Sequence, residues 1–167
     1  NDRTNEFRRS SYYLTCDRVN GVLTVYTDST MRIPIKTIRV SVGKAGTETP
    51  TGTWTMHRAG RWQELMGPSW GQYGTHVVNG IFVHSVACGQ ANSYNLPVGE
   101  YLRLGNPASH GCIRACVADA KWVWDNCNGS KIHIFDGTYT SNEALKGPLG
   151  RKALTPLRDS KIGRAHV

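Results

Sequence analysis

The chain contains the stretch Ser109-His110-Gly111-Cys112-Ile113-Arg114, directly ahead of a segment with helical spacing. A thiol near a helix N-terminus gains from the positive end of the helix dipole, which favours the thiolate. Gly111 allows a positive φ or a very close approach beside the thiol. Backbone N–H groups there could converge on a substrate carbonyl oxygen as an oxyanion hole. From these residues alone, a nucleophilic cysteine and a small buried cysteine beside a surface histidine are comparable interpretations.

A cysteine nucleophile also needs a base, and the histidines nearest to Cys112 in the sequence are His84 and His110. His84 ends the apolar run Ile81-Phe82-Val83, which predicts a strand that would present the imidazole rigidly at a strand edge.

A zinc site is the alternative use of these side chains, because the region holds enough nitrogen and sulfur ligands: His84, Cys88, His110, Cys112 and Cys116. Their spacings, H-x3-C and H-x-C-x3-C, repeat no known finger pairing. The zinc-deaminase signature is absent as well, since Ser85-Val86 follows His84. We therefore expect no metal.

The pattern around these motifs is mostly β. Alternating or β-rich runs predict strands at Tyr12–Cys16, Val22–Tyr26, Ile33–Val42, Thr53–Met56, His76–Val78, Ile81–Val86 and Lys131–Phe135. Asn20-Gly21 and Asn79-Gly80 are hairpin turn signals. Val117–Cys127 has the one clear helical period. His57–Tyr73 shows no clear period and predicts a long loop or a lid, and Cys88–Gly99 is polar and irregular.

Composition restricts the class of protein further. With 39% hydrophobic residues and no apolar run of the roughly 18 residues that a membrane span needs, the 167-residue chain suits one globular domain. The net charge of +8 comes from scattered basic residues and no nucleic-acid-binding motif accompanies it, so we expect no nucleic-acid partner.

The five cysteines permit either one reactive thiol with up to two disulfides, or buried reduced thiols. One pairing is excluded: if residues 116–127 form one helix, the ends of that helix lie ~16 Å apart, beyond disulfide reach.

Two separated motifs together resemble the L,D-transpeptidase catalytic domain of the YkuD family: Phe82-Val83-His84-Ser85, then Ala108-Ser109-His110-Gly111-Cys112-Ile113-Arg114. Ser41-Val42-Gly43-Lys44 and Thr49-Pro50-Thr51-Gly52-Thr53-Trp54 resemble that family's turn and following strand. Asp119-Ala120-Lys121-Trp122 and the Gly-Ser-Lys-Ile-His-Ile stretch from Gly129 resemble its helix and closing strand. The resemblance covers about Tyr12 to Phe135.

The resemblance implies a β-sandwich of mixed sheets, with one main helix after the catalytic cysteine and a cleft beneath a lid. It implies that Cys112 attacks a peptidoglycan stem tetrapeptide, releases D-Ala and forms a thioester that an acceptor amine resolves into a cross-link. His84 would be the general base, oriented through the backbone carbonyl of Ser85. His110 would flank the nucleophile, and Gly111 and Cys112 would offer oxyanion N–H groups.

The substrate contacts that follow are Arg114, as a partner for a carboxylate, and Ser109, which could donate a hydrogen bond or cap the helix. Trp62 and Trp70 in the lid region are further candidates. No cofactor is implied, and β-lactams of the carbapenem type are expected inhibitors. Twenty-four residues separate His84 from Ser109, more than in the compact family pattern, which predicts an enlarged loop at the mouth of the site.

Two other functions use the same residues. In an L,D-carboxypeptidase or hydrolase, water would hydrolyse the thioester. A zinc-stabilised or peptidoglycan-binding module would not catalyse a reaction at all. The expected location is extracytoplasmic, at the cell wall, cell surface or periplasm. A signal peptide or membrane anchor could lie upstream of Asn1, and the sequence leaves open whether the protein is secreted freely or anchored.

The predicted division of the chain is a linker or remnant at 1–11, the catalytic domain at 12–136 and a linker or truncated extension at 137–161. Residues 162–167 match a reading frame of a sequencing adapter.

Overall fold

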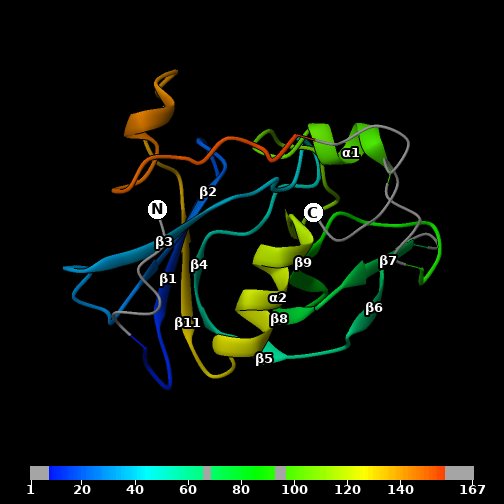
Figure 1. The fold of residues 1–167 in the computed structure, drawn as a ribbon, viewed down its shortest axis with the longest axis horizontal. Coiled ribbons are helices and arrows are strands. Elements are labelled where there is room, and N and C mark those ends of the chain that lie inside the picture. Colours follow the sequence, from blue (N-terminus) through cyan, green and yellow to red (C-terminus); the bar gives the residue numbers. More distant parts are fainter. Residues whose placement is uncertain (1–7, 66–68, 93–96, 157–167) are drawn as a thin grey trace.

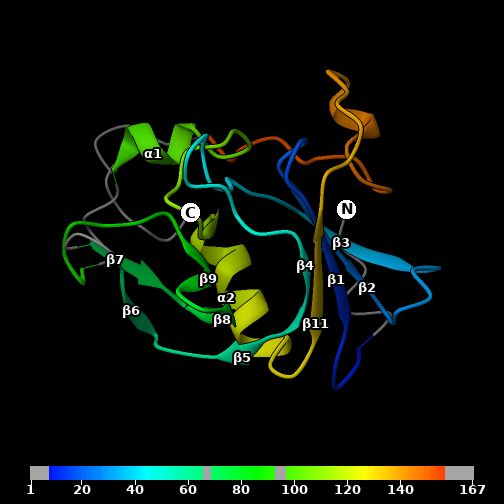
Figure 2. The same cartoon turned by 180° about the vertical axis from the view of Figure 1, so that it is seen from behind.

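Two mixed β-sheets face each other across a shared core in the computed structural model, which describes residues 8–65, 69–92 and 97–156 (Figure 1). The larger sheet lies on one side of the molecule, and the smaller sheet with the main helix lies on the other. The view from behind in Figure 2 shows the same two layers. This arrangement confirms the predicted mostly β architecture of mixed sheets.

The larger sheet has the strand order β3-β2-β1-β11-β4. Its strands are β1 (Tyr13–Asp17), β2 (Val22–Tyr26), β3 (Pro34–Arg39), β4 (Gly52–Thr55) and β11 (Lys131–Phe135). β1 runs antiparallel to β2 and parallel to β11, so the first and last strands of the domain are neighbours. Gly21 has a φ of 61° in the β1–β2 turn, as its Asn-Gly signal predicts.

The smaller sheet has the strand order β10-β9-β8-β5. Its strands are β5 (His57–Arg58), β8 (Thr75–Val78), β9 (Ile81–Ser85) and β10 (Ile113–Ala115). β8 and β9 form the hairpin that Asn79-Gly80 predicts, with Asn79 at a φ of 48°. β10 pairs with β9 in parallel and was not predicted, because three residues are too few to show a period.

β10 also corrects the expectation that Cys112 lies directly ahead of a helix. The main helix α2 spans Val117–Asn126, within one residue of its predicted bounds. Because β10 lies between Cys112 and this helix, the dipole of α2 does not act on the thiol at its N-terminus. A second helix, α1 (Val98–Leu102), was not predicted and lies in the loop between the two motifs.

The segment expected to be an irregular lid is instead ordered as a hairpin of β6 (Trp62–Leu65) and β7 (Ser69–Gln72). The prediction of a loop was wrong because both strands are short and carry glycine and charged residues, which hides the two-residue alternation. β7 is joined to the rest of the molecule by a bridge in which Trp70 and Cys88 exchange both backbone hydrogen bonds at 2.7 Å.

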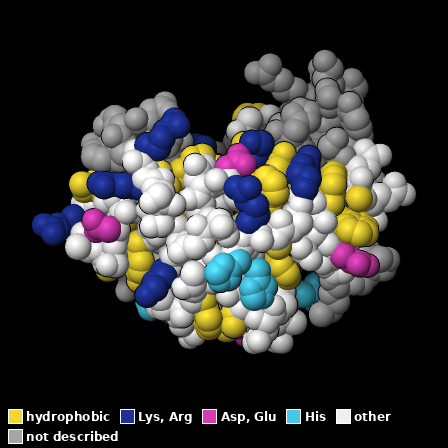
Figure 3. Space-filling model, turned by 90° about the horizontal axis from the view of Figure 1, so that it is seen from below, with side chains coloured by type: hydrophobic (Ala, Val, Ile, Leu, Met, Phe, Trp, Pro, Cys, Tyr) yellow, Lys and Arg dark blue, Asp and Glu magenta, His cyan; other side chains and the backbone are white. Residues whose placement is uncertain are grey.

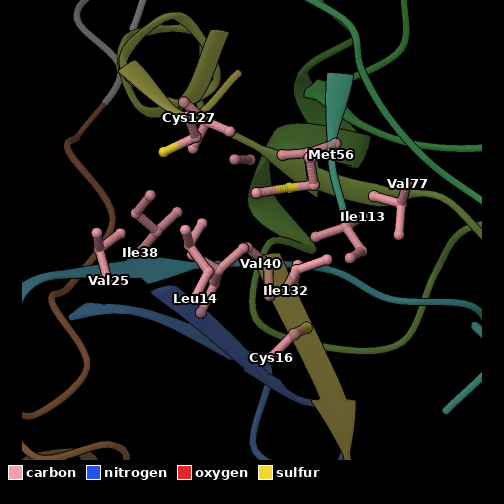
Figure 4. Packing of buried hydrophobic residues seen from close by; sticks show 14 of the residues in the cluster. Leu14, Cys16, Val25, Ile38, Val40, Met56, Val77, Ile113, Cys127 and Ile132 are labelled. Atoms are coloured by element: carbon pink, nitrogen blue, oxygen red, sulfur yellow. The ribbon is translucent and has the colours of Figure 1, made fainter. Parts of the chain in front are cut away.

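The core lies between the two sheets and under α2 (Figure 4). Its buried side chains come from both sheets and from the helix, among them Leu14, Val25, Ile38, Val77, Ile113, Val123 and Ile132. A buried ion pair also ties β3 to α2, where Lys36 Nζ lies 3.3 Å from Asp119 Oδ1. The helix is therefore fixed to the larger sheet as well as to the smaller one.

Within the described residues, no helix is long and apolar enough to cross a bilayer. Figure 3 shows Lys and Arg side chains distributed over one face of the molecule, with histidine side chains near its middle. The basic side chains of that face do not gather into one band. This agrees with the sequence, in which the basic residues are scattered.

The segment that follows β11, expected to be a linker or truncated extension, folds back onto the domain as far as residue 156. It includes the 3-10 helix η1 (Glu143–Leu145) and the buried side chain of Arg151. Arg151 donates to the carbonyls of Asn20 and Gly105 at 2.9 and 2.7 Å and makes a bidentate pair with Glu143 at 2.6 and 2.7 Å. The pairing lowers the pKa of Glu143 to about 2.

Replacing this guanidinium should measurably destabilise the fold. Arg151→Met leaves the carbonyls of Asn20 and Gly105 without their donor, which we expect to cost about 2–4 kcal/mol in the free energy of unfolding. Urea denaturation followed by circular dichroism measures the change. Lys152→Met, at the exposed neighbouring position, is the matched control and should stay within about 0.5 kcal/mol of the wild type. Equal stability of the two variants would contradict this role of Arg151.

Candidate active site

A pocket of about 290 Å³ opens between the β6–β7 hairpin and the β9–β10 edge of the smaller sheet. Its walls combine the two sequence motifs with the hairpin: Glu64, Leu65, Ser69, Gly80, Phe82, His84, Ala87, Ser109, His110, Cys112 and Arg114. The structure therefore brings five of the nine predicted site residues to one cavity: Cys112, His84, His110, Ser109 and Arg114.

Cys112 lies half-buried just before β10, over the β8–β9 turn. Its Sγ accepts a hydrogen bond from the backbone N–H of Phe82 at 3.4 Å and lies 3.5 Å from the carbonyl oxygen of Gly80. Burial raises the pKa of the thiol above its ordinary 9.0, and the Phe82 N–H and the charge of Arg114 only partly oppose this. At neutral pH the resting group is thus a thiol.

His84 lies in β9 and is 1% exposed. Its Nδ1 is hydrogen-bonded to the backbone carbonyl of Ser85, and since a carbonyl can only accept, Nδ1 carries the proton. Nε2 is then the ring nitrogen able to accept a proton. Burial is the main cause that lowers the pKa of His84 to about 4, so the imidazole is neutral at pH 7.

The expected place of His84 at a strand edge is corrected, because β9 lies between β10 and β8. Two residues of β7 hold the ring there and were missed in the sequence. A Cβ on Gly71 would come within 2.6 Å of His84 Nδ1, so only glycine lets β7 approach so closely. The N–H of Gln72 donates to Ser85 Oγ at 2.8 Å, which fastens β7 beside the histidine.

The turn ahead of Cys112 is stabilised by two hydroxyl groups. Ser109 Oγ donates to the Cys112 carbonyl at 2.6 Å and accepts from the Gly111 N–H at 3.1 Å, so it caps this turn rather than α2. Thr49 Oγ1 donates to the Gly111 carbonyl at 2.6 Å and accepts from the Gly43 N–H at 2.9 Å. Thr49 was missed as a site residue, although it lies in a stretch that carries the family resemblance.

Gly111 has a φ of 125°, in the region that favours glycine. Its N–H, expected to serve an oxyanion hole, is directed at Ser109 Oγ in this structure. A role in binding a substrate oxygen would need this N–H to be shared or released.

Arg114 lines the pocket but is already paired. Its NH1 lies 2.8 Å from Oε2 of Glu100, a residue of α1 that sequence reasoning missed. Nothing in the local pattern of the loop signals this contact, since it depends on where the loop folds. The guanidinium expected to meet a substrate carboxylate therefore holds a carboxylate of its own chain.

The remaining predicted residues differ in their placement. His110 is exposed at the pocket wall. Trp62 and Trp70 belong to the hairpin but do not line the pocket, and the hairpin presents Glu64, Leu65 and Ser69 to it instead. The Trp62 ring lies under the guanidinium of Arg61, 5.1 Å from its carbon.

All five cysteines are free thiols, so no disulfide forms. Among the described residues, no group of three or more His, Cys, Asp and Glu side chains is arranged to hold a metal ion. The candidate ligands His84 and Cys112 instead share a pocket with backbone and arginine partners.

Comparisons with known proteins agree with this geometry. The model of the YkuD family, the L,D-transpeptidase catalytic domain, matches residues 11–141. A stretch of 27 residues, 16% of this chain, is 59% identical to YciB of Bacillus subtilis (strain 168) and covers 14% of that protein.

Two L,D-transpeptidases are among the solved structures that share the fold. An L,D-transpeptidase from Mycobacterium tuberculosis H37Rv superposes with a TM-score of 0.59 at 18% sequence identity. The superposition covers 75% of this chain and 58% of the M. tuberculosis chain. The LD transpeptidase LdtMt1, in complex with imipenem, superposes with a TM-score of 0.55 at 19% sequence identity. That superposition covers 75% of this chain and 59% of the LdtMt1 chain. The chain thus spans less than two thirds of the length of each of these relatives.

The family model covers most of the chain, and the motif residues Cys112 and His84 meet in one pocket of the corresponding fold. The chain belongs to the YkuD family, the L,D-transpeptidase catalytic domains.

Proposed function

We propose that this chain is a peptidoglycan L,D-transpeptidase that works through a thioester on Cys112. The observation that carries the proposal is the shared pocket of a half-buried thiol and a buried histidine whose tautomer is fixed. A cysteine, a base and a group that orients the base are the parts that nucleophilic acyl transfer needs. Family membership supports the substrate class. We propose that the chain acts outside the cytoplasm, where this substrate would be found.

In the proposed reaction, Cys112 Sγ attacks the carbonyl carbon that precedes the terminal D-Ala of a stem tetrapeptide. His84 Nε2 takes the thiol proton and then gives it to the departing amine of D-Ala. The tetrahedral intermediate collapses to a thioester as the C–N bond breaks. An acceptor amine next attacks the thioester, loses a proton to His84 and leaves a new amide bond with the thiol restored.

The β6–β7 hairpin would exclude water from the thioester. Leu65 supplies an apolar side chain from this hairpin to the pocket wall. Water exclusion decides between transfer to an amine and hydrolysis, because both nucleophiles attack the same carbonyl. The imipenem complex of LdtMt1 supports carbapenems as acylating probes of this site.

Incubation with a disaccharide tetrapeptide tests the function directly. We expect a cross-linked dimer and free D-Ala by mass spectrometry, and one covalent imipenem adduct per chain. Cys112→Ala should show neither, while Cys88→Ala, a buried thiol outside the pocket, should keep both. Tripeptide without dimer would identify a hydrolase, and an adduct that survives Cys112→Ala would refute the nucleophile.

The two histidines of the pocket should differ in their effect on acylation. His84→Ala removes the proposed base, and we expect the rate of imipenem adduct formation to fall about 10²–10⁴-fold. His110→Ala changes an exposed side chain of the pocket wall, so we expect a loss of less than about tenfold. Stopped-flow absorbance measures both rates, and the reverse order would overturn the assignment of the base.

The pH dependence of acylation should follow the buried imidazole. Because the pKa of His84 is lowered to about 4, Nε2 stays available as pH falls through 6.5, and we expect the rate to drop only near pH 4. His110→Ala should leave this acid limb in place. Circular dichroism at each pH controls for unfolding. A limb centred at pH 6.5 or higher would show that a solvent-exposed histidine controls the reaction.

A further inference from the structure

The Arg114 guanidinium is the one arginine or lysine head group on the described pocket wall, and it is largely buried, with 12% of its side chain exposed. Glu100 Oε2 lies 2.8 Å from NH1 of this arginine, and the other oxygen of Glu100 lies 3.2 Å from Arg103 NH1. A charge-assisted pair of this length is among the strong polar contacts of a protein, particularly when partly shielded from water. Glu100 thus neutralises the arginine at the pocket wall.

Packing places Glu100 there. The neighbouring Tyr101 is 1% exposed and contributes to a second apolar cluster with Val86, Leu104 and Val117. Its hydroxyl also donates to the carbonyl of Thr155 at 2.6 Å. Thr155 belongs to the segment that follows β11 and folds back onto the domain. Since α1 is held on both sides, the carboxylate is delivered to Arg114 by a fixed element of the loop between the two motifs.

The pairing of Arg114 with Glu100 affects the charge near the Cys112 thiol and the other titratable groups of the pocket. The titratable groups that line the pocket are Glu64 from β6, His84 from β9, and His110, Cys112 and Arg114 from the segment around β10. The charge of Arg114 acts on both reacting groups, since it lowers the pKa of the Cys112 thiol and of His84. Glu100 approaches from α1 and offsets that charge.

We propose that Glu100 is a specificity-determining residue of this site: it pairs with NH1 of the guanidinium that would bind an anionic group of the acyl donor, so a donor carboxylate competes with Glu100 for Arg114. This proposal rests on the proposed function for the identity of the donor. It implies that the free site is neutral at Arg114. Exchanging one carboxylate for another on the same guanidinium yields little net affinity, because the number of charge-assisted hydrogen bonds stays the same.

The wild-type protein should therefore discriminate weakly between a tetrapeptide with a free terminal carboxylate and the same peptide with a terminal carboxamide. Glu100→Gln keeps the size of the side chain and removes its charge, which leaves Arg114 available to an anion. We expect the preference for the carboxylate donor, measured as the ratio of kcat/KM values, to rise about tenfold in this variant, mainly through a lower KM.

Arg103→Gln is the matched control, because it removes the other partner of the same carboxylate from an exposed position and leaves the pair with Arg114 intact. Its donor preference should equal that of the wild type. Glu100→Ala should behave like Glu100→Gln. An unchanged donor preference in both Glu100 variants, at unchanged melting temperature, would overturn the proposal, as would a shift of equal size in Arg103→Gln.

A second measurement is independent of turnover. The rate of iodoacetamide alkylation of Cys112, followed by intact mass from pH 6 to pH 10, reports the thiolate fraction. With Arg114 no longer offset, the alkylation profile of Glu100→Gln should move to lower pH, with several-fold faster alkylation at pH 8. The profile of Arg103→Gln should not move. An unshifted Glu100→Gln profile would refute the role of Glu100 in offsetting Arg114.

The two measurements separate the possible failures. If no variant processes either peptide, the proposed function fails. The proposal for Glu100 is then decided by the alkylation profile and by calorimetric binding of both peptides to the Cys112→Ala protein with and without Glu100→Gln.

Discussion

The parallel pairing of β10 with β9 is the contact on which the rest of the site depends. It sets Arg114 opposite His84 in register and so brings the thiol of Cys112, just before β10, to the strand that carries the histidine. The pairing is supported from the far side, where Ser41 bridges Arg114 and the Thr49 hydroxyl bonds the Gly111 carbonyl. Without these contacts the two motifs would be unrelated segments, since a long loop separates them. Their geometry is therefore a property of the sheet.

Burial, more than any single charge, sets the protonation of the pair. It raises the pKa of Cys112 and lowers that of His84, so both groups rest in the neutral state. The bond from Nδ1 to the Ser85 carbonyl then directs the available lone pair of the imidazole to Nε2. A helix dipole does not prepare the thiolate, because α2 begins only after β10. In the proposed reaction, proton transfer would accordingly accompany attack on the substrate, when the developing charges stabilise each other.

The long loop between the motifs and the C-terminal segment form a second supporting layer around this pair. Tyr101 and Leu104 anchor the loop in its own apolar cluster. Two hydrogen bonds connect the loop with the C-terminal segment: Arg151 donates to the Gly105 carbonyl, and the Tyr101 hydroxyl donates to the Thr155 carbonyl. Stability of that segment and placement of Glu100 are therefore linked through contacts far from the reacting atoms. The loop contributes a charge to the pocket as well as a wall, because it delivers Glu100 to Arg114.

The sequence by itself determined the mostly β class, the two Asn-Gly hairpins, the main helix and the two motifs whose residues line the pocket. Each of these has a local signal, either a period that follows strand or helix geometry or a motif of adjacent residues. Tertiary structure alone decided the three-residue strand β10, the hairpin that was expected to be a loop, and the contacts of Gly71, Thr49 and Glu100. Those features join segments far apart in the chain, and their energies come from close packing, burial and ion pairing between them. A local sequence pattern does not indicate which distant partner a residue will contact. The hydrophobic period of a strand or helix, in contrast, is repeated along the element itself.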